Sequence, residues 1–114
     1  MPALPVPRFD QFYRHTELTR LLQDYAAAAP HLVQLHSLGQ SFEGRDIWLL
    51  SLTNIATGAD TDKPAFWVDG NIHAAELTAC TACLYCCTSC SPATTLTPPC
   101  ASCWTRASST WCRA

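Results

Sequence analysis

The chain has 114 residues and a formal net charge of −2, from seven Lys and Arg against nine Asp and Glu. This length suits one domain with a modest core, and the near balance of charge excludes a basic footprint for nucleic acid or anionic lipid. No apolar run is long enough to cross a bilayer, and no secretory leader pattern is visible, so we expect a cytoplasmic protein without a nucleic-acid or membrane partner.

An amphipathic helix is predicted near the N-terminus. Thr16 is a suitable N-cap, Glu17 belongs to the first turn, and Pro30 ends the helix after Ala29. The apolar positions recur at helical spacing: Leu18, Leu21, Leu22 and Tyr25. The first element is therefore expected to pack one face against a core.

Three strands and a second helix follow. Residues 32–39 and 46–53 read as two strands joined by a polar turn, which is typical of a hairpin. A third strand opens at Pro64 and leads towards His73, and residues 75–85 favour a helix rich in Ala and Leu. Trp48 and Phe66 are predicted core residues of these strands. The order indicates the opening part of an α/β fold whose sheet is incomplete.

The end of the third strand carries the residues with the clearest chemistry. Gly70-Asn71 breaks the strand, and an imidazole at His73 and a carboxylate at Glu76 follow three positions apart. Loops at strand ends often present functional groups, and imidazole and carboxylate are both zinc ligands. We predict that His73 and Glu76 form half of a metal site.

Three segments carry a further signal: Ser41-Phe42-Glu43-Gly44-Arg45 leading into 46–50, Lys63-Pro64-Ala65 opening a strand, and Gly70-Asn71-Ile72-His73-Ala74-Ala75-Glu76. Through these segments the chain resembles the zinc carboxypeptidases of the carboxypeptidase A and B type. The last segment resembles the first zinc-binding motif of that family. The resemblance covers about residues 10–85 and implies the truncated N-terminal part of a zinc carboxypeptidase-like mixed-sheet fold.

The resemblance also implies a mechanism. Members of the family hold Zn²⁺ with this His, this Glu and a second His far downstream, and they hydrolyse the C-terminal bond of a peptide, or a related amide, by zinc-activated water. A downstream Glu acts as general base, and downstream residues, Arg among them, bind the substrate carboxylate. None of these has a counterpart here, because His15, His31 and His36 all precede the motif and no Asp, Glu or His follows Glu76. We therefore expect this chain to be an inactive fragment.

The C-terminal part differs from the rest in composition. All eight cysteines lie at or after Cys80, and the only charged residues after Glu76 are Arg106 and Arg113. We interpret 1–85 as the N-terminal portion of the catalytic domain and 86–114 as a Cys-rich, irregular tail that is no domain. A one-base shift of reading frame after Tyr85 would turn GC-rich Leu codons into Cys codons, and the nucleotide sequence tests this hypothesis.

Other readings of the same residues remain open. Cys80, Cys83, Cys100 and Cys103 have the spacing of a small structural zinc-binding module, with 16 residues between the two pairs. A disulfide framework would need an oxidising compartment. The chain is also compatible with an inert interaction domain in which His73 and Glu76 are ordinary polar loop residues.

Overall fold

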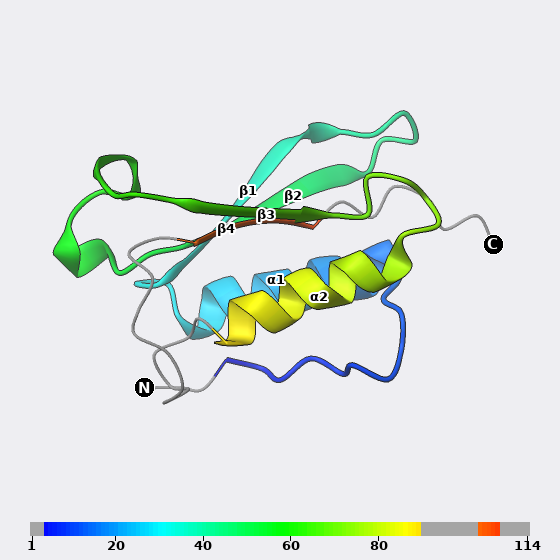
Figure 1. Ribbon diagram of the computed structural model, residues 1–114, viewed down its shortest axis with the longest axis horizontal. Helices are drawn as coiled ribbons and strands as arrows, with labels where there is room; N and C mark the ends of the chain where they lie inside the picture. Colours follow the sequence, from blue (N-terminus) through cyan, green and yellow to red (C-terminus); the bar gives the residue numbers. More distant parts are fainter. Residues whose placement is uncertain (1–3, 90–102, 108–114) are drawn as a thin grey trace.

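A computed structural model describes residues 4–89 and, as backbone, residues 103–107 (Figure 1). The elements in chain order are α1 His15–Ala28, β1 Val33–Gln40, β2 Asp46–Leu52, two short 3₁₀ turns at Ile55–Thr57 and Asp60–Asp62, β3 Phe66–Gly70, α2 Leu77–Ser89 and β4 Cys103–Ala107. The predicted order of helix, three strands and helix is thus confirmed, and one strand is added to it.

The four strands form one mixed sheet in the order β1-β2-β4-β3. β1 and β2 are an antiparallel hairpin, closed by a turn in which the Ser41 N–H donates to the Arg45 carbonyl at 2.8 Å. β4 is antiparallel to β2 and parallel to β3. The segment β3-α2-β4 is therefore a β-α-β unit, and the carboxyl end of β3 is the edge at which such units usually present ligand-binding groups.

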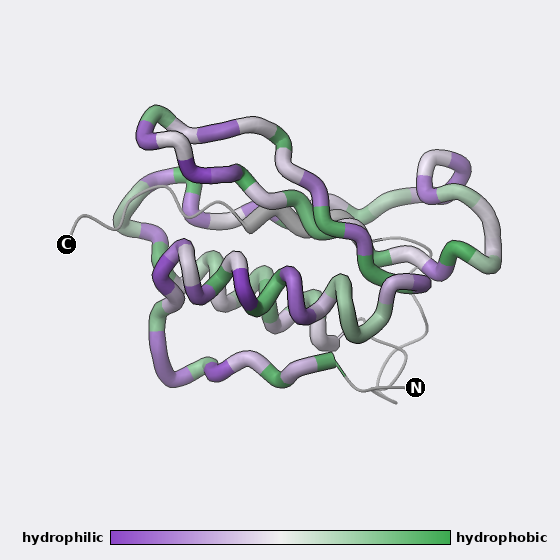
Figure 2. Tube along the Cα trace, turned by 180° about the vertical axis from the view of Figure 1, so that it is seen from behind, coloured by the Kyte–Doolittle hydropathy of each residue, from purple (hydrophilic) through white to green (hydrophobic). Residues whose placement is uncertain are grey.

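Both helices cover the same side of the sheet, and the core lies between the two layers (Figure 1). Its buried apolar side chains come from α1, β1, β2 and α2 together with the N-terminal segment: Leu4, Leu18, Leu22, Tyr25, Ala29, Val33, Leu50, Leu52, Cys80, Leu84 and Cys87. Hydrophilic and hydrophobic residues alternate along α1 in Figure 2, as expected for a helix with one face on a core. The apolar face predicted from the sequence is the face that packs.

The start of α1 and one strand residue differ from the predictions. The helix begins at His15 with Arg14 as N-cap, and the Glu17 carboxylate accepts the Arg14 N–H at 2.8 Å, so Thr16 is not the cap. Trp48 packs against the core as predicted, and its indole N–H donates to Thr19 at 2.9 Å. Phe66 does not, because it begins the outermost strand on its side of the sheet and is 57% exposed.

The prediction of an irregular tail over residues 86–114 is wrong at two places. α2 continues to Ser89, past the position where the tail was predicted to begin, and residues 103–107 form β4 in the middle of the sheet. Cysteine behaves as a small apolar residue, so Cys87 occupies a buried helix position. A strand between two others is held by backbone hydrogen bonds, which any sequence without proline supplies. The rest of 86–114 lies outside the described residues.

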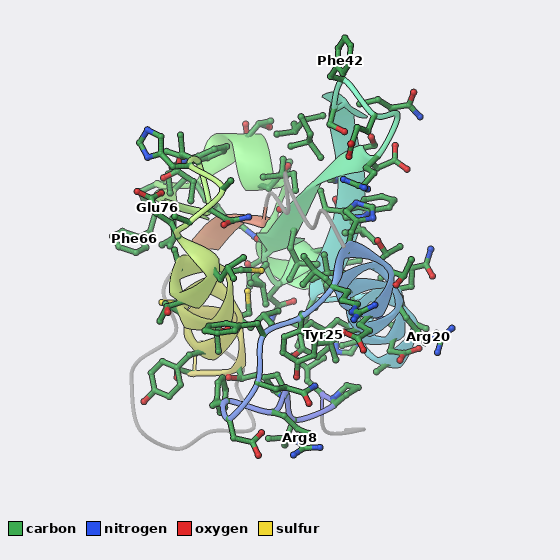
Figure 3. The ribbon with its side chains drawn as sticks, turned by 90° about the vertical axis from the view of Figure 1, so that its right-hand side faces the viewer. Arg8, Arg20, Tyr25, Phe42, Phe66 and Glu76 are labelled. Atoms are coloured by element: carbon green, nitrogen blue, oxygen red, sulfur yellow. The ribbon has the colours of Figure 1, made fainter. Side chains whose placement is uncertain are left out.

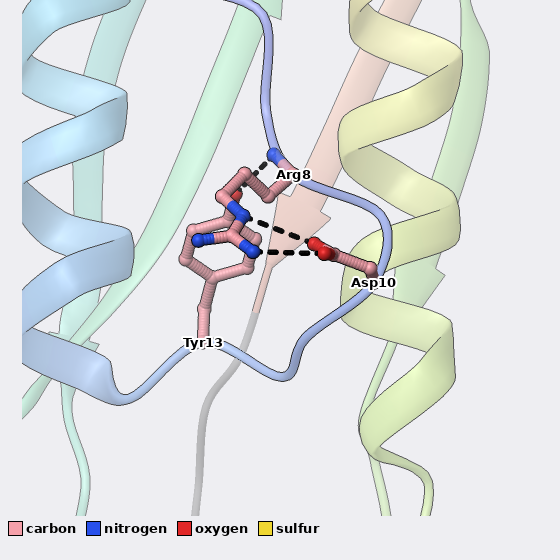
Figure 4. A network of polar contacts seen from close by, with 3 residues as sticks. All are labelled: Arg8, Asp10 and Tyr13. Atoms are coloured by element: carbon pink, nitrogen blue, oxygen red, sulfur yellow. Dashed lines mark hydrogen bonds and ion pairs between the residues drawn. The ribbon is translucent and has the colours of Figure 1, made fainter.

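The segment before α1 crosses beneath both helices (Figure 1). Its charged residues form a small exposed network, shown in Figure 4, in which Arg8 donates to both carboxylate oxygens of Asp10 at 3.0 and 2.8 Å. The Arg8 backbone N–H donates to the Tyr13 hydroxyl at 2.6 Å. Exposed pairs of this kind contribute about 0–1 kcal/mol, so buried Leu4 is the stronger attachment of this segment.

Candidate metal centre

The loop between β3 and α2 presents the two residues predicted as metal ligands. β3 ends at Gly70, and the buried Asn71 adopts a left-handed conformation with φ of 59°. The chain then turns sharply, because the Glu76 N–H donates to the His73 carbonyl at 3.0 Å immediately before α2 begins at Leu77. Asn is one of the few residues that tolerate the left-handed conformation, so the sequence suits this turn.

Gly70 is required by the packing behind this loop. A Cβ atom at this position would lie 2.8 Å from the backbone C and O atoms of Ala79 in α2. Contacts that short do not occur, so any side chain would push α2 away from the end of β3. The glycine therefore lets the helix begin directly against the strand and fixes the loop from both sides.

His73 and Glu76 contact each other through their functional atoms. Nδ1 of His73 donates to Oε1 of Glu76 at 2.9 Å, and the other carboxylate oxygen accepts the His73 backbone N–H at 3.2 Å. These hydrogen bonds stabilise the ionised carboxylate and lower the pKa of Glu76 below its ordinary value. The side chains are 79% and 48% exposed, and Figure 3 shows Glu76 at the margin of the molecule beside α2.

The geometry of this pair fits a shared metal ion. Two ligands of a tetrahedral zinc ion, each about 2.0–2.2 Å from the metal, lie about 3.3 Å apart. Nδ1 and Oε1 are already 2.9 Å apart, so a small movement, together with loss of the Nδ1 proton, would bring them to that geometry. An ionised carboxylate and an imidazole are also the chemical types that zinc accepts.

Within the described part of the chain, no further ligand joins the pair. No group of three or more His, Cys, Asp and Glu side chains is placed to hold a metal there. His15 contacts the Asp46 backbone carbonyl at 2.9 Å, between α1 and β2, and His36 lies on β1 at the other edge of the sheet. Among the described residues, none of the three early histidines completes a metal-binding group with the pair.

The cysteines of α2 face the core. Cys80, Cys83 and Cys87 are buried, and burial raises the pKa of the Cys80 thiol to about 11. A thiol with that pKa is protonated at neutral pH, whereas zinc binds the thiolate. Cys103 lies in β4, and Cys100 lies outside the described residues. The alternative of a structural zinc module built on these four residues gains no support.

The packing role of Gly70 and Asn71 was missed. The sequence predicted the pair as the end of the strand and the start of the motif segment, but not as a contact with α2. These residues also set the position of α2, because the helix packs over the end of the strand. Nothing in the local sequence pattern indicates that packing.

In the described part of the chain, no helix combines the length and apolar character of a membrane span.

Comparison with known proteins gives one consistent result. The zinc carboxypeptidase family matches residues 18–90. A zinc carboxypeptidase of Saccharothrix mutabilis subsp. capreolus is 36% identical over 69 residues, which cover 60% of this chain and 15% of that protein. Human carboxypeptidase D is 47% identical over 47 residues, which cover 40% of this chain and 3% of that protein. The chain thus spans a small part of the length of these relatives.

Solved structures show the same fold. The carboxypeptidase A from Helicoverpa armigera superposes with a TM-score of 0.76 over 88% of this chain and 25% of that one, at 23% identity. Thrombin activatable fibrinolysis inhibitor superposes with a TM-score of 0.75 over 93% of this chain and 27% of that one, at 18% identity. The mixed sheet with its two helices is thus a truncated carboxypeptidase-like α/β unit. Because the family match covers more than half of the residues, the chain belongs to the zinc carboxypeptidase family.

Proposed function

We propose that His73 and Glu76 are zinc ligands of a metallocarboxypeptidase, an enzyme that hydrolyses C-terminal peptide bonds of a peptide or related amide substrate. The single observation that carries this proposal is the 2.9 Å approach of Nδ1 of His73 to Oε1 of Glu76, in an exposed loop at the carboxyl end of a strand. Family membership supports the same reading.

The residues of this chain have distinct parts in such a site. The lowered pKa of Glu76 keeps its carboxylate ionised, and the backbone hydrogen bond from His73 orients it. Gly70 and Asn71 hold the loop against α2, so little ordering is needed when a metal binds. Zinc, when bound, lowers the pKa of a bound water towards about 7 and polarises the scissile carbonyl.

Isothermal titration of the 114-residue chain with Zn²⁺, under reducing conditions, tests this assignment. We expect His73→Ala to weaken zinc binding by more than tenfold, since removal of even a residue that only supports a ligand commonly costs 10- to 100-fold. Glu76→Gln should have a similar effect. His36→Ala, on the opposite edge of the sheet, is the matched control and should bind as the parent does. Equal affinity of His73→Ala and the parent would refute the assignment.

A further inference from the structure

We infer that Cys83 and Cys86 of α2 are a redox-sensitive pair, which hydrogen peroxide converts to a reversible disulfide. This modification site lies outside the proposed metal centre and does not depend on zinc. Three observations carry the inference: the spacing of the two residues, the difference in their exposure, and the ring contact made by Tyr85 between them.

The spacing of the cysteines along α2 permits a disulfide within the helix. Cys80, Cys83 and Cys86 follow one another at intervals of three residues, in the helix of the β3-α2-β4 unit. A Cys-x-x-Cys pair beside a β-α-β unit is typical of thiol–disulfide redox sites. Side chains three residues apart in a helix have Cβ atoms about 5–6 Å apart, whereas a disulfide needs about 3.5–4.5 Å. A local tightening of the helix by about 1–2 Å therefore closes such a pair.

Exposure determines which cysteine is oxidised first. Among the described cysteines of α2, only Cys86 is partly exposed, and the others are buried. Peroxide reacts with an accessible thiolate, so oxidation begins at Cys86. Cys80 and Cys83 have the same spacing, but both are buried, and the pKa of Cys80, raised to about 11, keeps its thiol protonated.

The partner of Cys86 follows from the same geometry. Adjacent Cα atoms, such as those of Cys86 and Cys87, lie about 3.8 Å apart, whereas those of a disulfide usually lie about 4.4–6.8 Å apart. Cys87 is therefore a poor partner. Cys83 is buried, but it has only to reach a sulfur on its own helix, one turn away, and needs no contact with the oxidant.

The reaction balances with hydrogen peroxide as the oxidant. The thiolate of Cys86 attacks one peroxide oxygen, the O–O bond breaks, and hydroxide leaves and takes up a proton to become water. The sulfur of Cys83 then attacks the sulfenic acid at Cys86, so that the S–S bond forms and the second oxygen leaves as water. Two thiols and one peroxide thus give one disulfide and two waters.

Closure of the pair acts on the N-terminal segment, which crosses beneath both helices (Figure 1). Tyr85 lies between the two cysteines, and its ring contacts the ring of Phe9 edge-on, with centroids 5.7 Å apart. The two rings are 60% and 48% exposed, so few other contacts fix their orientation. Tightening the helix around Tyr85 therefore shifts its ring and weakens the contact with Phe9.

Mass spectrometry of the oxidised chain tests the pair. The reduced chain, in the presence of a chelator, is treated with equimolar hydrogen peroxide, unfolded, alkylated and digested with chymotrypsin, which cleaves after Tyr85 and so separates Cys83 from Cys86. We expect the two peptides to remain joined until dithiothreitol is added. A link from Cys86 to any other cysteine overturns the pair, and so does full alkylation of Cys83.

Two variants form a matched comparison, because Cys83→Ala and Cys80→Ala each remove one buried sulfur from α2. In Cys83→Ala, oxidation should stop at the sulfenic acid of Cys86, which dimedone traps. Cys80→Ala should still form the disulfide. Loss of the disulfide in both variants, with unchanged circular dichroism, overturns the assignment. If either variant fails to fold, the chymotryptic peptides of the parent chain decide the question alone.

Limited trypsin cleavage after Arg8 measures the effect on the N-terminal segment. Arg8 is exposed and directly precedes Phe9. We expect cleavage of the native chain to be severalfold faster after oxidation. Tyr85→Ala, which removes the ring contact without changing the cleavage site, should be cleaved at the faster rate in the reduced state as well. Equal rates for the reduced and the oxidised parent would overturn the coupling to this segment.

Discussion

Gly70 shows how one backbone position controls both packing and the site. Its hydrogen atom faces the backbone of Ala79, where a methyl group would lie at 2.8 Å. Overpacking of this kind costs about 1–3 kcal/mol, because backbone must move. The same movement would carry the start of α2, and with it Glu76, away from the end of β3.

We therefore expect Gly70→Ala to lower the free energy of unfolding by about 1–3 kcal/mol in urea denaturation and to weaken zinc binding as well. Gly44→Ala is the control, since Gly44 has a φ of 75° in the hairpin turn and open space around its Cα. That variant should lose stability through backbone strain alone and keep the zinc affinity of the parent. Loss of zinc affinity in both variants, or in neither, would contradict the positional role of Gly70.

At the scale of a whole element, α2 is a helix whose core face is largely cysteine. Cys80, Cys83 and Cys87 share this buried face with Leu84. Burial raises the pKa of Cys80 to about 11, above the value of about 8.5 for an unfolded thiol. Because the folded pKa is the higher one, the stability contributed by the protonated thiol is complete below about pH 8.5. It is lost as the pH rises towards 11.

The free energy of unfolding should therefore fall between about pH 8.5 and 11, with a contribution from Cys80 of at most about 1.4 kcal/mol per pH unit. Urea denaturation at several pH values measures this slope. Cys80→Ala should reduce the slope, whatever its effect on stability at neutral pH. An unchanged slope in Cys80→Ala would show that burial does not raise the pKa of this thiol above its value in the unfolded chain.

The elements also show what a sequence can predict here. α1, the hairpin and α2 were predictable because each has its own periodicity, turn or composition within a few residues. β4 was not, because Cys103–Ala107 has no alternating pattern and is held by β2 and β3, which lie far away in sequence. Phe66 was predicted in the core because an alternating strand gives no indication that it lies at an edge.

The candidate site also has a part that the sequence predicts and a part that it does not. His73 and Glu76 were predictable from their spacing after a strand, and the structure brings their functional atoms together. The contact between Gly70 and Ala79 was not predictable, since it arises only when α2 folds back on β3. Neighbouring residues in the sequence therefore predict which side chains can bind a metal. The packing that positions those side chains is not predictable from them.

At the scale of the whole molecule, the chain spans a quarter of the length of the carboxypeptidase that it superposes on. No Asp, Glu or His follows Glu76 in this sequence, so its later part supplies neither a second imidazole ligand nor a carboxylate general base. General acid–base catalysis typically contributes 10²- to 10⁴-fold to a rate. Among the described residues, no third ligand joins His73 and Glu76.

We accordingly expect no zinc-dependent cleavage of a blocked dipeptide by the purified chain, measured by release of the C-terminal amino acid. A full-length zinc carboxypeptidase in the same assay is the positive control. Turnover that requires zinc and disappears in His73→Ala would contradict this expectation and would mean that the ligands present suffice.

The strand order has a consequence for how this polypeptide is made. β4 comes last along the chain yet lies between β2 and β3, so the two parts of the sheet cannot join until residues 103–107 have been synthesised. During translation, β2 and β3 each keep one edge unpaired until β4 is made. Unpaired strand edges are where nascent chains aggregate or recruit chaperones. Ribosome stalling or chain cleavage before residue 103 would prolong that exposed interval.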